Sequence, residues 1–287
     1  MSSNVIISAD STCDLSEELL RQYSIRTIPY HIEYRGCDHL DSVGITPEAI
    51  YEGFREDGSL PNTSAINVQE YASYFKSIGE SGYEVVHLNL GGALSSSHDH
   101  ACLAAQELEG VRVVDSCNLS TGIGQLAIRA SRMAESGMPA GDIVVELERM
   151  KGRVHTSFVL EELEFMAAGG RCPQVFAHAG KTLRLRPEIT VDTRDGSMHV
   201  GRLYHGSMRK ALREHLREQV EKNPGILTDD VFVTHSGEVS PALLHETYSE
   251  LHRLLPGLRR VHVTRASCTI SSHCGPGTLG IIFVTEE

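Results

Sequence analysis

Short turns rich in glycine, serine and threonine contain the residues of this chain that are best suited to chemistry. The clearest is the turn of residues 91–97, GGALSSS, which follows an apolar run and precedes a helical pattern. Free backbone N–H groups at the start of a helix attract anions, and the small Gly91 and Gly92 let a ligand come close. Ser95 and Ser96 add hydroxyl donors. The turn therefore indicates an anion site, although the same serines could serve only as a helix cap.

Three further segments carry side chains that could bind an acid. Thr63 and Ser64 present two hydroxyls in a polar stretch that could equally be a solvated turn. His273 lies just before Gly275 in the sequence HCGPG, which predicts an imidazole on a rigid, exposed bend or an incidental histidine in a structural turn. Arg171 follows two glycines that are expected to end a helix, where it could pair with a carboxylate or form only a surface ion pair.

Other motif matches do not support cofactor or metal chemistry. Residues 122–127 fit GxGxxA, but they lie several residues beyond a strand and lack the acidic residue expected about 20 positions later. His98 and His100 stand two apart in a helical segment, so their side chains would point in different directions. The sequence contains no HExxH, GxxxxGK[ST] or GxSxG motif. We therefore expect no metal and no cofactor.

Composition limits the classes of function. The chain has 287 residues, which is enough for one large domain or two ordinary ones. Its net charge of −12 disfavours nucleic-acid binding, because phosphate contacts need clustered Lys and Arg. Tryptophan is absent and aromatic residues make up 6%, so an apolar pocket must be lined mainly by aliphatic side chains. The seven cysteines form no CxxC pair, which argues against a disulfide framework or a Cys-rich zinc site.

Targeting signals are not evident. The first residues show no basic region followed by a long apolar core. A membrane-spanning helix needs about 20 consecutive apolar residues, and the sequence has no such stretch. We expect a cytoplasmic protein.

Alternating strands and helices must position these turns in the first half of the chain. Helices are expected to begin near Ser16, Thr46 and Asn67, and residues 36–44 read as a loop. Asp115 and Ser116 close a strand before a long helix. Such alternation predicts a mostly parallel sheet covered on both faces. The strands expected here are residues 5–8, 25–34, 85–90 and 111–114, and the long helix is residues 119–135.

After about residue 155 the pattern changes. Asp195 and Gly196 form a hairpin signal between alternating residues, while crossover signals continue around it. We therefore predict a two-domain α/β fold, with an N-terminal domain of residues 1–158 built on a mostly parallel sheet. The second domain, residues 159–287, would carry a mixed or antiparallel sheet. The strands expected after about residue 155 are 155–160, 231–234, 261–264 and 281–284, and the expected helices are 163–168, 207–221 and 240–254.

Taken together, these segments resemble the DegV family of bacterial fatty-acid-binding proteins. The matching motifs run in order along essentially the whole chain. They are Asp10-Ser11-Thr12 with Asp14-Leu15, Thr63-Ser64, Leu94-Ser95, Val114-Asp115-Ser116 with Ser120 and Gly122, Leu163-Glu164-Phe165 to Gly169-Gly170-Arg171, and His273 to Gly277.

The resemblance implies a DegV-like two-domain fold with a fatty acid in a pocket at or near the domain interface. It implies that Ser/Thr hydroxyls and a histidine hold the carboxylate, and that glycine and acidic turns support them. The carboxylate residues would be Thr63, Ser64, Ser95, Ser96 and His273, and the supporting turns would contain Gly91, Gly92, Asp115, Ser116 and Gly275.

The resemblance also implies a partner. Family members of this type are the binding subunit of a fatty acid kinase, and they present the acyl carboxylate to a separate ATP-dependent subunit that makes acyl phosphate. Arg171 would lie at the exposed head-group end and help to dock that partner. The protein itself would have no turnover, would hold a long-chain fatty acid as its only ligand and would contact membranes only transiently.

Two alternatives remain open at this point. The first is a serine hydrolase or thioesterase with Ser95 or Ser96 as nucleophile and His273 as base, oriented by Asp10 or Asp115. The second is a sensor module for another small acid. It is motivated by differences from the family, which usually has Gln-Pro-Ser after the Thr-Ser pair, where this chain has Ala65-Ile66-Asn67, and Ser-Ser where this chain has Gly91-Gly92.

Overall fold

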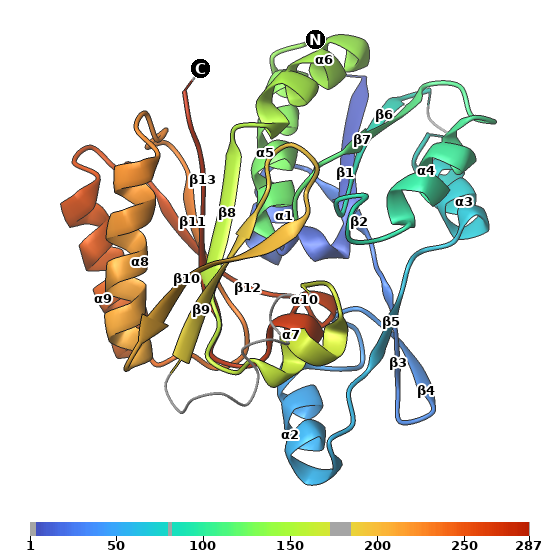
Figure 1. The fold of residues 1–287 in the computed structure, drawn as a ribbon. Coiled ribbons are helices and arrows are strands. Elements are labelled where there is room, and N and C mark those ends of the chain that lie inside the picture. Colours follow the sequence, from blue (N-terminus) through green and yellow to red (C-terminus); the bar gives the residue numbers. More distant parts are fainter. Residues whose placement is uncertain (1–3, 80–81, 173–184, 287) are drawn as a thin grey trace.

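The computed structural model describes residues 4–79, 82–172 and 185–286. Within them the chain forms three sheets, with the four-stranded and six-stranded sheets side by side and a small three-stranded sheet below them (Figure 1). The first sheet is parallel and the second is mixed. This mixed α/β architecture confirms the predicted fold class.

The first sheet has four parallel strands in the order β2-β1-β6-β7. Its central strands are almost continuously buried, because α5 and α6 pack on one face while α3 and α4 lie on the other (Figure 1). The strands are β1 (Val5–Asp10), β2 (Arg26–Ile28), β6 (Glu84–Asn89) and β7 (Val111–Asp115). The helices are η1 (Ser11–Cys13), α1 (Glu17–Gln22), α3 (Val68–Gly79), α4 (Ser97–Ala105), α5 (Thr121–Glu135) and α6 (Ala140–Lys151).

The second sheet has six strands in the order β10-β9-β8-β13-β11-β12. Only β11 and β12 pair in parallel, and the predicted hairpin at Asp195 and Gly196 joins the antiparallel β9 and β10. The strands are β8 (Val154–Val159), β9 (Leu185–Val191), β10 (Met198–His205), β11 (Val231–His235), β12 (Val261–Arg265) and β13 (Leu279–Val284). The division expected between residues 158 and 159 stays a prediction, and β8, which spans it, pairs with β9 and β13.

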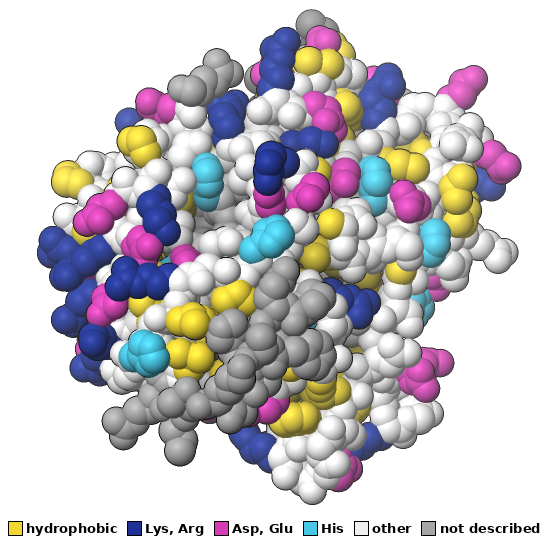
Figure 2. Space-filling view, viewed as in Figure 1, with side chains coloured by type: hydrophobic (Ala, Val, Ile, Leu, Met, Phe, Trp, Pro, Cys, Tyr) yellow, Lys and Arg dark blue, Asp and Glu magenta, His cyan; other side chains and the backbone are white. Residues whose placement is uncertain are grey.

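Two long helices, α8 (Met208–Lys222) and α9 (Pro241–Leu254), pack together against the second sheet. Figure 2 shows Lys and Arg side chains gathered at the left edge, over these helices. Several of them form ion pairs between the helices, such as Arg209 with Glu246 at 3.1 Å and Arg217 with Glu250 at 2.8 Å. Exposed pairs of this kind contribute little stability each.

The third sheet was not expected. Residues 25–34 were predicted to form one strand, but β2 ends before Pro29, which has no N–H for a sheet ladder, and a separate strand follows. Residues 36–44 were predicted to form a loop, but a tight turn at Arg35 and Gly36, both with positive φ, starts a hairpin strand there. The antiparallel strands are β3 (His31–Tyr34), β4 (Cys37–Leu40) and β5 (Asn62–Ser64), in the order β4-β3-β5.

Three shorter helices complete the fold. The helix α2 (Pro47–Asp57) begins at the predicted Thr46 cap, whose hydroxyl accepts from the Ala49 N–H. The helices α7 (Glu164–Gly169) and α10 (Cys268–Cys274) contact each other near the centre of the molecule (Figure 1). The prediction that His273 lies on an exposed bend was wrong. Because the Ser267 cap starts α10 earlier, His273 falls in its last turn, and only the following GPG forms the bend.

Candidate functional site

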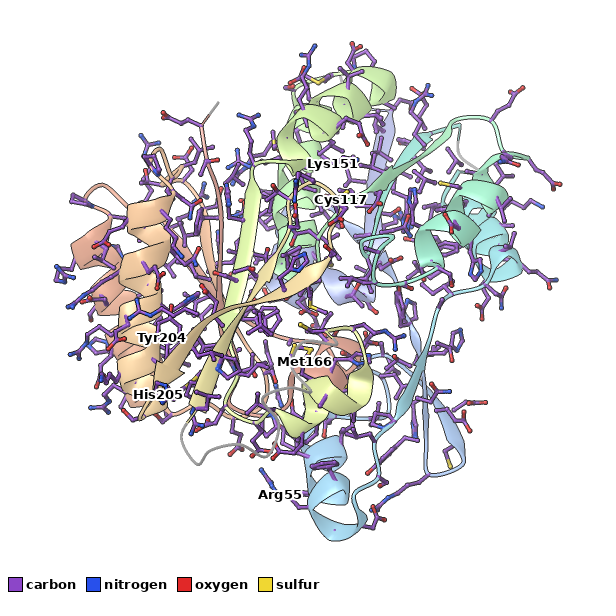
Figure 3. The ribbon with its side chains drawn as sticks, viewed as in Figure 1. Arg55, Cys117, Lys151, Met166, Tyr204 and His205 are labelled. Carbon is purple, nitrogen blue, oxygen red and sulfur yellow. The ribbon has the colours of Figure 1, made fainter. Side chains whose placement is uncertain are left out.

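A cavity lies where the ends of the first sheet meet α7 and α10. It measures about 750 Å³ including its open mouth. Figure 3 labels Met166, which reaches this region from α7. The apolar lining is Ala65, Leu90, Leu94, Leu119, Met166, Met198, Ile270 and Cys274. The polar lining is Tyr30, Thr63, Ser95, Ser96, Arg171, Thr269 and His273.

The turn of residues 91–97 contributes Leu94, Ser95 and Ser96 to this cavity, and its two glycines are held by hydrogen bonds to residues 115–118. The Gly91 N–H donates to the Asn118 carbonyl at 2.8 Å, and a Cβ on Gly91 would lie 3.0 Å from the Asn118 nitrogen. The Gly92 N–H donates to Asp115 Oδ1 at 3.1 Å. Ser116 holds Asn118 in turn, by donating to its carbonyl and accepting from its N–H. Asp115 and Ser116 therefore hold the turn through hydrogen bonds and do not line the cavity.

Ser95 carries the best-defined hydroxyl of the turn. Its Oγ accepts a hydrogen bond from the Tyr30 hydroxyl at 3.0 Å and another from the Ser97 N–H at 3.2 Å. Burial raises the pKa of Tyr30 above its ordinary value, so this phenol stays protonated and keeps donating. Ser96 also lines the cavity, and although it stands at the N-cap of α4 its side chain makes no capping bond.

The expected Thr63–Ser64 pair is divided by the geometry of β5. Successive side chains of a strand point to opposite faces, so Thr63 and Ala65 line the cavity while Ser64 is exposed outside it. Thr63 Oγ1 lies 3.1 Å from His273 Nε2. The structure therefore brings Thr63, Ser95, Ser96 and His273 together and leaves Ser64 out.

His273 is held as a neutral imidazole. Burial, together with the nearby charge of Arg171, lowers its pKa to about 4. Its Nδ1 has no hydrogen-bond partner among the residues that the structure describes. Gly169 packs directly on the ring, and any side chain there would collide with Nδ1. The first glycine of the GGR motif therefore makes room for the histidine, which sequence reasoning did not foresee.

Arg171 lies at the mouth of the cavity and is exposed. The helix α7 ends at Gly169. Gly170 follows in the left-handed conformation and turns the chain away from the helix just before Arg171. Its Nη1 donates to the Gly169 carbonyl at 2.9 Å. The guanidinium is thus positioned close to the polar end of the cavity yet remains open to solvent.

A second, smaller cavity lies next to the first and measures about 320 Å³ including its opening to solvent. The two share Leu119, Ile270 and Cys274 as lining residues. Several threonines line the smaller one, but their hydroxyls bond to the protein: Thr156 donates to Asn118 Oδ1 at 2.7 Å and Thr278 to the Cys274 carbonyl at 2.8 Å. Because these hydroxyls turn away, the wall that remains is almost entirely apolar.

Two functional features of this region had no signal in the sequence. The Tyr30–Ser95 contact joins residues 65 positions apart, and no motif spacing links them. The apolar end of the cavity is lined partly by threonines, which a composition-based reading counts as polar. Only the hydrogen-bond partner of each hydroxyl in the fold, such as Asn118 for Thr156, reveals the apolar surface.

The histidines of α4 do not form a metal site. His100 Nδ1 lies 2.8 Å from the Ile66 carbonyl, while His98 Nε2 lies 3.5 Å from Cys102 Sγ. Among the described residues, no group of three His, Cys, Asp or Glu side chains could hold a metal ion. No helix in the described part of the chain is both long and apolar enough to cross a bilayer.

Known proteins match this fold along nearly its full length. A DegV domain-containing protein of Deinococcus radiodurans is 29% identical over 97% of each chain. A DegV domain-containing protein of Clostridium perfringens is 27% identical over 98% of each chain. Both alignments include the turns and helices that build the cavity.

Solved structures agree in fold. A DegV family protein of Thermus thermophilus, described by its fatty acid binding, is 29% identical, with a TM-score of 0.85 over 98% of this chain and 99% of that chain. A protein of Thermotoga maritima, whose structure is described as revealing a fatty acid binding function, is 26% identical, with a TM-score of 0.83 over 99% of this chain and 100% of that one.

A family model settles the relationship. It describes uncharacterised proteins of the DegV family and matches residues 4–286. The match spans both large sheets and every segment that lines the two cavities. This chain therefore belongs to the DegV family.

Proposed function

We propose that this protein binds a long-chain fatty acid in these two adjacent cavities. The carboxylate lies against Thr63, Ser95, Ser96 and His273, and the acyl chain runs past Ile270 into the smaller cavity. The observation that carries the proposal is the division of the space into a hydroxyl-lined end and an apolar end. The fatty acid binding described for the Thermus and Thermotoga proteins supports it.

The energetics favour such a ligand. Burying an acyl chain contributes about 0.8 kcal/mol per methylene, so a dozen methylenes contribute about 10 kcal/mol. A buried carboxylate must still be matched by donors, because an unpaired buried charge is costly. When His273 carries its proton on Nε2, it donates to Thr63 Oγ1, and the Thr63 hydroxyl is free to donate to the ligand. Neutral donors of this kind hold the anion without neutralising its charge.

We further propose that the protein is a carrier without turnover of its own, and that it serves a separate ATP-dependent kinase in the cytoplasm. The head group lies near the mouth, where Arg171 is exposed and could contact an acidic surface of the partner. A carboxylate held by hydroxyls keeps its nucleophilic oxygens for phosphoryl transfer. Loading from a membrane then requires only transient contact.

The hydrolase alternative lacks the required geometry. A nucleophilic serine needs a hydrogen bond to its base, and the base needs an orienting partner. Here His273 Nε2 pairs with Thr63, its Nδ1 has no partner among the described residues, and Ser95 accepts from Tyr30. Asp10 and Asp115 bond elsewhere, to Leu90 and to Gly92. No observation favours the sensor alternative over a fatty acid carrier.

Native mass spectrometry of the freshly purified protein tests the proposal. We expect a fatty acid adduct that is lost on denaturation and that organic extraction identifies. Ile270→Phe provides the matched variant, because Ile270 lines both cavities and a larger side chain would take up space where they meet. The variant should retain shorter acyl chains than the wild type. If no acyl species co-purifies and added C16 or C18 acids fail to bind, the proposed function is wrong.

A further inference from the structure

Tyr30 is held rigidly beside the head-group end of the cavity. Its N–H donates to Ser11 Oγ at 3.1 Å, and its carbonyl accepts from the Asp41 N–H at 2.8 Å. Only 2% of the residue is exposed, and its side chain lines the cavity. The phenol reaches across to the opposite wall, where it donates to Ser95 Oγ. Tyr30 is therefore held by its backbone bonds at one end and bonded to Ser95 at the other.

The Ser95 hydroxyl can form only a limited number of hydrogen bonds. A serine hydroxyl has one O–H donor and two acceptor lone pairs. The Tyr30 hydroxyl and the Ser97 N–H supply two donors to Ser95 Oγ, which occupy both lone pairs. Within the described residues, no protein acceptor takes the Ser95 O–H. The one bond that Ser95 still has to make is a donation, and the cavity is the open space beside it.

We propose that Tyr30 is a positioning residue that makes Ser95 an obligate donor, and that the site thereby selects an ionised carboxylate over neutral head groups on the same acyl chain. This inference rests on the proposed function. A carboxylate only accepts hydrogen bonds, so it matches such a site. A fatty alcohol brings an O–H that needs an acceptor, and Ser95 has no lone pair left for it.

The test compares two ligands that differ only at the head group. Dodecanoate and 1-dodecanol compete for the delipidated full-length protein against the fluorescent probe cis-parinaric acid, and the absence of tryptophan keeps the protein background low. In Tyr30→Phe, the Ser95 hydroxyl can turn and accept. We expect dodecanoate to bind about fivefold to twentyfold more weakly, and dodecanol to change by less than about twofold.

The matched control is Tyr34→Phe. The Tyr34 hydroxyl is buried, has no hydrogen-bond partner among the described residues and does not line the cavity. This variant should leave the ratio of the two affinities as in the wild type. It also reports any general effect of removing a buried phenol oxygen.

A double-mutant cycle links the effect to Ser95. In a Ser95→Ala background, Tyr30→Phe should cause no further change in the acid-to-alcohol ratio. Equal weakening of both ligands by Tyr30→Phe, or a ratio change that persists without Ser95, would overturn the proposal. A wild-type protein that binds neither ligand would instead contradict the proposed function, so the two failures are distinguishable.

Discussion

Two groups of polar side chains lie close together at the ends of the first sheet. They differ in whether hydrogen-bond donors remain available to a ligand. In the core cluster (Asp10, Tyr71, His87 and Asn89), the Asp10 carboxylate accepts from the Tyr71 hydroxyl at 2.7 Å, from the Leu90 N–H at 2.9 Å and lies 3.2 Å from His87 Nε2. In the cavity cluster (Tyr30, Thr63, Ser95 and His273), Ser95 accepts from the Tyr30 hydroxyl, Thr63 pairs with His273, and all four residues line the cavity.

The difference separates structure from binding. The core cluster contains its own carboxyl group as acceptor, so its donors are used inside the fold and contribute to stability. The cavity cluster is built from neutral groups and has no anion of its own, so its remaining donors are available to a ligand. Substitutions in the first should therefore change the free energy of unfolding, whereas substitutions in the second should change ligand affinity.

The largest expected effect is that of Asp10→Ala. Removing the carboxylate leaves the Tyr71 hydroxyl and the Leu90 N–H buried without an acceptor. We expect the free energy of unfolding to fall by about 3–5 kcal/mol, measured by urea denaturation. The exposed Asp38→Ala is the control and should change it by less than about 0.5 kcal/mol. A loss below 1 kcal/mol would show that the core cluster is not structural.

Asp14 sharpens the comparison, because it is a buried carboxylate with fewer donors than Asp10. It accepts from Ser120 Oγ at 2.5 Å and from the Ser267 N–H at 2.9 Å. Burial outweighs these bonds and raises its pKa to about 7. The folded state therefore holds a proton that the unfolded chain has lost, so the stability from this group is full below about pH 4 and is lost as the pH rises through 7.

Asp14→Asn should remove that titration. We expect the variant to gain stability relative to the wild type as the pH rises from 4 to 8, by on the order of 2–4 kcal/mol. Urea denaturation across this pH range measures the difference, with Asp38→Asn as the exposed control. A wild-type-minus-variant difference that does not vary with pH would show that Asp14 is already ionised in the fold.

The smallest expected effect on stability is in the cavity cluster. Thr63→Val keeps the shape of the side chain but removes its hydroxyl, so fatty acid affinity should fall about tenfold while the free energy of unfolding changes by less than about 1 kcal/mol. Ser64→Ala, one residue along β5 and outside the cavity, should leave affinity unchanged. Calorimetric titration with palmitate measures both. Equal affinities for the two variants would break the distinction between the clusters.

Local patterns predicted much of this molecule, and long-range contacts decided the rest. The alternation of strands and helices, the Thr46 cap and the hairpin at Gly196 are local features, and all three are confirmed. The sheet of β3, β4 and β5 was missed because it depends on the break at Pro29 and on pairing with residues 62–64.

The candidate site shows the same division. The motifs picked out the turn of residues 91–97, Thr63, Arg171 and His273, and Ser95 and Ser96 of that turn line one cavity with the other three residues. They could not separate Thr63 from Ser64, because that depends on which face of β5 turns inward. Nor could they find Tyr30, whose role comes only from its contact with Ser95. Motif order identifies the neighbourhood of a site, whereas side-chain direction requires the fold.

The walls of the cavity come from distant parts of the chain, and this affects when a ligand can be enclosed. Thr63 and Ser95 belong to early segments, whereas Ile270 and His273 lie on α10. On the ribosome, the first sheet can form well before α10 emerges. The nascent protein would then have the Thr63 and Ser95 side of the cavity without the α10 side. Lipid loading should therefore follow synthesis, and a bound acyl chain should tie early and late segments together and protect the folded chain against unfolding.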